Sequence, residues 1–76
     1  MSVYRSILPL LADNHIYPVK TEVLVTMQGD EDVDLRVECP SILKFDRMAH
    51  IKNVLGKGWD VKWIGNGVDE IVIKKL

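Results

Sequence analysis

A strict alternation of apolar and charged residues in the middle of the chain constrains the fold more than any other feature. Odd positions are apolar and even positions are charged, the apolar ones being Val33, Leu35, Val37 and Cys39. A period of two puts successive side chains on opposite faces, so this segment is typical of a strand with one buried and one solvated face. Such a strand needs neighbouring strands and an apolar layer over its buried face.

Three further segments show the same period, at residues 22–28, 59–64 and 68–76. Their in-phase apolar residues are Val23, Val25, Met27, Trp59, Val61, Trp63, Ile71 and Ile73. Turn-forming residues at 29–32 lie between the segment 22–28 and the central segment, and those at 65–67 lie between 59–64 and 68–76. The sequence therefore predicts two hairpins.

The positions of the apolar residues limit the registers that place all of them on the same face of each hairpin. In the first hairpin, both apolar sets are odd-numbered, so paired residue numbers must sum to an even value. Met27 opposite Val33 satisfies this and leaves a five-residue loop, 28–32. A slip by one residue would turn one apolar set outward.

In the second hairpin, Asn66 and Gly67 favour a two-residue turn, which would set Ile71 opposite Lys62. A three-residue loop, 65–67, instead places Gly67 at a left-handed position and keeps the apolar sets together. We expect this second register, with the pairs Ile64–Val68, Val61–Ile71, Trp59–Ile73 and Lys62–Glu70.

Helical spacing marks two other segments. Ser2–Asn14 has an apolar face and Ser2 as a candidate cap, but Pro9 either kinks this helix or begins a shorter one. Ser41–Leu55 is expected to form a helix that ends at Gly56. Its wide apolar stripe comprises Ile42, Phe45, Met48, Ala49 and Leu55, with Ile51 and Val54 nearby.

These elements predict an α+β fold with the order α-β-β-α-β-β. We expect a four-stranded, mainly antiparallel sheet with two helices packed on one face, and the strand order stays open. The 76 residues are expected to form one domain, 1–76. Because residues 2–39 and 41–76 both run helix then hairpin, an internal duplication is also open.

Composition excludes several classes of protein. The single cysteine excludes an internal disulfide framework and a cysteine-based zinc site. Apolar runs fall short of the ~20 residues of a membrane span, and the layout of a signal peptide is absent. We therefore expect a soluble, cytoplasmic protein that does not interact with membranes.

The formal net charge of −1 conceals two halves of opposite sign. Residues 1–39 carry three basic and seven acidic side chains, a net charge of −4, and residues 40–76 carry seven basic and four acidic side chains, a net charge of +3. The acids concentrate at the first hairpin turn, where Asp30, Glu31, Asp32 and Asp34 lie close together in sequence. Their spacing lacks the alternating oxygen ligands and final glutamate of a calcium loop, so no metal site is expected.

Catalytic signatures are weak. Cys39 and the two histidines, His15 and His50, match no nucleophile motif, and Cys39 is in phase with buried residues. No glycine-rich phosphate loop is present. The sequence predicts a protein that is not an enzyme and uses no cofactor.

The favoured hypothesis is a small interaction or regulatory module that binds a protein partner. Its contact surface would combine the acidic hairpin tip with the open sheet face, where Leu24, Ile64 and Val72 would form a patch if the strand order joined them. The candidate partner-binding residues are Asp30, Glu31, Asp32, Asp34, Leu24, Arg36, Ile64 and Val72. An unprotected sheet edge offers a route to a homodimer.

The alternative is a nucleic-acid-binding module that uses the basic C-terminal half. Lysines would contact phosphates and a tryptophan would stack on a base, through Lys57, Lys62, Trp63, Lys74 and Lys75. The phase of the strands weighs against this hypothesis, because it puts Trp63 on the core face and Lys62 on the opposite one.

Overall fold

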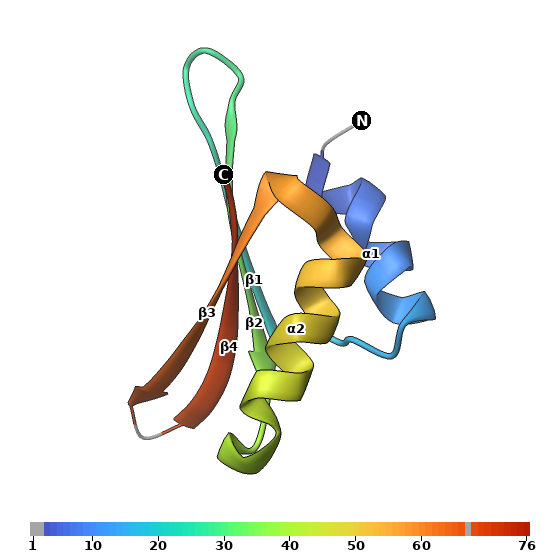
Figure 1. The fold of residues 1–76 in the computed structure, drawn as a ribbon. Helices are drawn as coiled ribbons and strands as arrows, with labels where there is room; N and C mark the ends of the chain where they lie inside the picture. The colour runs from blue at the N-terminus through green and yellow to red at the C-terminus, as the bar shows by residue number, and fades with distance from the viewer. Residues whose placement is uncertain (1–2, 67) are drawn as a thin grey trace.

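A computed structural model describes residues 3–66 and 68–76 and contains two α-helices and a four-stranded antiparallel sheet. The elements are α1 (Val3–Asp13), β1 (Lys20–Val25), β2 (Glu31–Glu38), α2 (Lys44–Leu55), β3 (Trp59–Asn66) and β4 (Val68–Lys75), with 3-10 turns at Ser41–Leu43 and Gly56–Gly58. The predicted α+β class and the order α-β-β-α-β-β are confirmed. Both helices lie on one face of the sheet (Figure 1).

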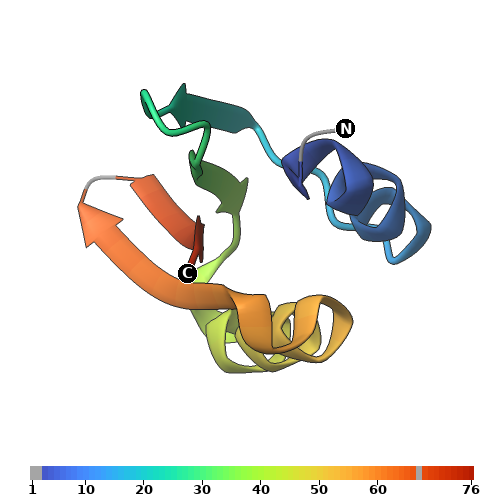
Figure 2. The same cartoon turned by 90° about the horizontal axis from the view of Figure 1, so that it is seen from above.

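The strand order in the sheet is β1-β2-β4-β3. The central strands β2 and β4 come from different hairpins and pair antiparallel, with Leu35 opposite Ile73. The edge strands are therefore β1 and β3. Seen along the sheet, α1 lies beside the first hairpin and α2 beside the second (Figure 2).

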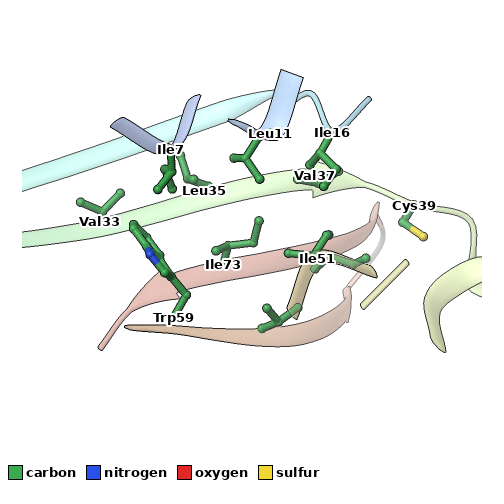
Figure 3. Close-up of a cluster of buried hydrophobic side chains, with 12 residues drawn as sticks. Ile7, Leu11, Ile16, Val33, Leu35, Val37, Cys39, Ile51, Trp59 and Ile73 are labelled. Carbon is green, nitrogen blue, oxygen red and sulfur yellow. The ribbon is translucent and has the colours of Figure 1, made fainter. Parts of the chain in front are cut away.

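The core lies between the sheet and the two helices. Ile7 and Leu11 of α1 and Ile51 of α2 are buried against the central strands (Figure 3). The other buried apolar side chains of this cluster are Ile16, Val33, Leu35, Val37, Cys39, Trp59, Val61, Ile71 and Ile73. Both halves of the chain contribute to this one cluster.

The first helix runs through Pro9 and does not begin at it. Its end is set by His15, which has a φ of 60°. The amide of the next residue, Ile16, donates a 2.8 Å hydrogen bond back to the Leu11 carbonyl, and the Ile16 side chain is buried. The predicted cap, Ser2, lies outside the described residues.

The second predicted helix divides into a 3-10 turn, Ser41–Leu43, followed by α2. Its predicted apolar stripe is too wide. Met48, Ile51 and Leu55 face the core, whereas Ile42 is 88% exposed and Phe45 is 77% exposed. Each residue turns a helix by about 100°, so Phe45 lies about 120° and Ala49 about 160° around the helix from Ile51, and both face away from the buried stripe. The predicted end is confirmed, with a φ of 75° at Gly56.

The first hairpin has the predicted parity but not the predicted register. Val23, not Met27, lies opposite Val33. The turn closes earlier because the Thr26 amide donates to the Asp30 carbonyl at 2.8 Å and the Asp30 amide donates to Thr26 Oγ1 at 3.1 Å. Gly29 provides the positive φ of 87° that this turn needs.

The register predicted for the second hairpin is also wrong, because each residue of β4 pairs two positions further along β3 than expected. Asn66 pairs with Val68, Val61 with Ile73 and Trp63 with Ile71, which leaves Lys62 opposite Val72. Gly65 belongs to β3 instead of the loop and pairs with Asp69, so the ladder is longer than expected. The even shift keeps both apolar sets on the core face. Gly67 lies outside the described residues.

Candidate functional site

Side chains on the open face form rows across the sheet, and two neighbouring rows carry opposite net charge. One row runs across the four strands as Glu22, Asp34, Lys74 and Asp60, and the next as Lys20, Arg36, Val72 and Lys62. Cations of the second row thus lie beside anions of the first. The open face is a largely self-neutralised surface.

Four ion pairs account for this neutralisation. The distances are 2.9 Å for Lys20–Glu22, 3.2 Å for Lys74–Asp34, 3.5 Å for Lys62–Asp60 and 3.9 Å for Arg36–Glu70. The Lys20 ammonium, by hydrogen bonding and by its charge, lowers the pKa of the exposed Glu22 carboxyl. Exposed pairs of this kind stabilise a fold by only about 0–1 kcal/mol each.

The strand order does not bring together the three apolar residues of the open face. Leu24 lies on edge strand β1, and Ile64 lies on the opposite edge strand, β3, three rows further along. Val72, between them, is 1% exposed, and Arg36 lies opposite it in the ladder. The Arg36 Nε is itself buried without a hydrogen-bond partner among the described residues. The apolar patch predicted for a favourable strand order does not form.

The predicted acidic residues divide between the two faces of the first hairpin. Asp32 and Asp34 project from the open face, whereas Glu31 projects toward the helix side and is half-buried. The Asp34 carboxylate forms an ion pair with the Lys74 ammonium, and Asp30 and Asp32 are exposed. The carboxylates that face solvent most fully are therefore those nearest the turn.

The end of the first hairpin also exposes apolar side chains. Leu24 is 68% exposed, Val25 is 65% exposed and Met27 is fully exposed. This end extends past both helices (Figure 1), in a molecule 40 Å long and 26 by 19 Å across. We call residues 24–32 the hairpin end.

Sequence reasoning assigned Val25 and Met27 to the core face and so missed their exposure. Val25 does lie on that face, but its ladder partner is the acidic Glu31, and the core stops one row earlier at Val23 and Val33. The sequence does hold a signal for this end of the core. Glu31 stands at an odd position, where the alternation through Val33 and Leu35 would place an apolar residue. Met27 lies in the turn and has no strand position at all.

The residues of the alternative hypothesis do not share one surface. Lys62 and Lys74 lie on the open face in ion pairs, and Trp63 is half-buried against the core on the other face. Lys75, also odd-numbered, lies opposite Trp59 on the helix side, and Lys57 lies in the 3-10 turn after α2. The Lys44 ammonium lies 5.5 Å from the centre of the Trp63 ring and 5.0 Å from that of Phe45.

The candidate nucleophile and imidazoles are separate. Cys39 is buried, its Sγ lies 3.4 Å from the Pro40 carbonyl oxygen, and desolvation raises the pKa of its thiol. His50 Nε2 lies 3.4 Å from the Asn14 carbonyl oxygen, where it links α2 to the end of α1. Within residues 3–66 and 68–76, no three histidine, cysteine or acidic side chains gather in a way that could hold a metal ion.

Comparison with protein-family models, with curated proteins and with solved structures gave no match. No helix in the described part of the chain is long and apolar enough to cross a membrane. What this chain does is therefore inferred from its own geometry, in which the hairpin end is the most prominent exposed apolar feature of the sheet.

Proposed function

We propose that this chain is a small non-enzymatic module that binds a protein partner through the hairpin end. The observation that carries the proposal is the exposure of Leu24, Val25 and Met27 together on a projecting element. Single exposed apolar residues are common on protein surfaces. Here Leu24 projects from the open face, Val25 from the helix side and Met27 from the turn, so the hairpin end exposes apolar area on both of its faces, next to its carboxylates.

Charge gives this surface a preference among partners. Residues 20–38 carry Lys20 and Arg36 against six acidic side chains, a net charge of −4. Four of the acids lie within or beside the hairpin end: Asp30, Glu31, Asp32 and Asp34. A field of one sign accelerates encounter with a basic surface and disfavours acidic ones.

The contact surface in this proposal is narrower than the sequence alone suggested. Ile64 lies on the far edge strand, and Val72 is buried under its neighbours, so neither adds exposed apolar area near Leu24. Arg36 interacts with Glu70 across the sheet. We assign these three residues to the support of the open face rather than to the contact.

A comparison of variants tests the proposal. The hairpin variant combines Leu24→Thr, Val25→Thr and Met27→Gln, which keep strand-compatible side chains and remove apolar area. The matched control combines Ile42→Gln and Phe45→Gln, which remove a comparably exposed apolar pair from the 3-10 turn and the start of α2. Circular dichroism and thermal unfolding establish that both variants fold.

Each immobilised protein is exposed to the same lysate with and without nuclease treatment, and retained proteins are quantified by mass spectrometry. We expect a partner that the wild type and the control retain and that the hairpin variant loses by about tenfold or more, the effect of removing a central contact of about 1.4 kcal/mol. Equal retention by the hairpin variant contradicts the proposal. Loss of the retained material on nuclease treatment, together with quenching of tryptophan emission by single-stranded oligonucleotides, supports the nucleic-acid alternative instead.

A further inference from the structure

We infer that the partner of the hairpin end binds by adding one extended strand to the outer edge of β1, and that this strand alternates apolar with basic side chains. The inference rests on the proposed function, since it names the partner chemistry of the same site. It depends on three features of the first hairpin: the direction of the β1 backbone groups, the lack of protection along β1, and the charge around it.

Backbone groups of alternate β1 residues point away from the sheet. The Thr26 amide donates to the Asp30 carbonyl, so these two residues form a hydrogen-bonded pair of the antiparallel ladder. Hydrogen-bonded pairs recur at every second residue, and the residues between them point their backbone groups away from the partner strand. The N–H and C=O groups of Thr21, Val23 and Val25 therefore point outward. Within residues 3–66 and 68–76, no strand pairs with this edge and no backbone hydrogen bond outside the ladders uses these groups.

The outer edge of β1 has few of the devices that usually prevent strand addition. Lys20–Val25 contains no proline or glycine and every residue pairs in order with β2; the one irregularity stands at its start, where the Val19 amide donates to the Arg36 carbonyl at 2.8 Å. Its one lysine, Lys20, stands at the first position and pairs with Glu22 at 2.9 Å. The other edge strand, β3, carries the exposed Lys62 near its middle and Gly65 near its end. The edge of β1 is the more receptive of the two.

Side chains along β1 indicate what an added strand must carry. On the helix side, Val23 and Val25 offer apolar neighbours, so the residues beside them are expected to be apolar. On the open face, Glu22 lies next to Asp34, and Leu24 lies next to Asp32. A lysine or arginine beside Glu22 lies next to a carboxylate that Lys20 also contacts, and one beside Leu24 extends over an apolar side chain toward the exposed Asp32. An extended segment with alternating apolar and basic residues fits both sides.

The same charges disfavour a second copy of this chain as the occupant. Strand pairing between two copies would bring together two hairpins that each carry a net charge of −4 over residues 20–38. In the self-pairing centred on Val23, Glu22 faces Leu24 of the other copy and gains no cation. A basic strand forms the same backbone hydrogen bonds without this repulsion.

A synthetic peptide of about eight residues that alternates valine and lysine is the probe. It is titrated into isotope-labelled protein, and amide shifts and hydrogen exchange are followed by NMR. We expect the amides of Thr21, Val23 and Val25 to gain protection, and the affinity to fall as salt is added. A peptide that alternates valine and glutamate is the control and is expected to bind at least about tenfold more weakly.

Proline substitution tests the backbone contact separately from the side chains. Thr21→Pro removes one outward donor and leaves the ladder to β2 intact, whereas Thr21→Val keeps the donor. We expect Thr21→Pro to weaken peptide binding roughly fivefold more than Thr21→Val does, as loss of one hydrogen bond would. Exchange protection at β2 amides verifies that the hairpin persists in both variants.

Several results would overturn the inference. These are no binding of the valine–lysine peptide up to millimolar concentration, equal binding of the glutamate peptide, or binding that leaves the three β1 amides unprotected. Sedimentation that shows self-association through these same amides would identify a second copy as the occupant. None of these outcomes affects capture of a protein by the hairpin end, which the Leu24, Val25 and Met27 variant tests independently.

Discussion

Gly29 determines where the first hairpin turns and therefore which side chains reach its end. Its φ of 87° lies in the left-handed region, and no atom lies within 4 Å of where a Cβ would stand. A larger residue here would meet a conformational penalty and no steric clash. The turn it permits closes at Thr26 and leaves Met27 fully exposed.

The Gly29→Ala substitution is expected to lower the free energy of unfolding by about 1 kcal/mol, because alanine strongly disfavours positive φ. Gly58→Ala is the matched control, since Gly58 also has no atom near its Cβ position and does not have a positive φ. Urea unfolding followed by tryptophan fluorescence measures both. An equal effect of the two substitutions would show that the turn does not depend on the conformation of Gly29.

Cys39 is expected to make stability depend on pH in the alkaline range. Desolvation raises the pKa of its thiol in the fold, so the folded state holds the proton more tightly than the unfolded state. Its contribution is therefore complete below the unfolded pKa, near pH 8.5, and is lost as pH rises from there toward the folded pKa. Cys39→Ala lacks this contribution, so the difference in unfolding free energy between the two proteins shifts above about pH 8.5. A constant difference from neutral to alkaline pH contradicts the assignment.

At the level of the elements, periodicity predicted faces correctly and registers incorrectly. In both hairpins, the observed and expected registers differ by an even shift, which leaves Val23, Val33 and Trp63 on the core face in either case. Hydrophobic patterning distinguishes odd from even shifts only. The choice between even registers depends on turn hydrogen bonds such as the one from Asp30 to Thr26 Oγ1, which alternation does not encode.

The second helix shows the same limit in another form. Its sequence offers two apolar stripes about 120° apart around the helix, one through Ile51 and one through Phe45, and tertiary packing selects the first. Sequence reasoning could predict where the acids of the hairpin end lie, because turn composition marks them. It could not predict that Val25 is exposed, since that depends on how far the helices extend along the sheet.

Replacing an isoleucine by alanine at two positions, one buried and one exposed, tests which face of the second helix is buried. Ile51→Ala is expected to lower the free energy of unfolding by about 2–5 kcal/mol, because it opens a cavity at a fully buried site. Ile42→Ala, at an exposed position in the preceding 3-10 turn, is expected to change it by less than about 0.5 kcal/mol. Chemical denaturation measures both. Comparable losses would mean that Ile42 contributes to the core.

At the level of the whole molecule, the two helices cover only part of the sheet. The uncovered end of the first hairpin carries the exposed apolar side chains, and Lys62 and Lys74 of the second hairpin are paired with acids on the self-neutralised open face. The opposite net charges of the two halves of the sequence are thus partly cancelled across the sheet. The excess that persists is acidic and lies on the element that projects.

Hydrogen exchange of the chain with and without its captured protein partner tests the central claim most directly. Protection is expected in peptides that cover residues 20–32, with little change in those that cover residues 42–45 or 57–63. Protection confined to those other segments, with residues 20–32 unchanged, would contradict a contact at the hairpin end.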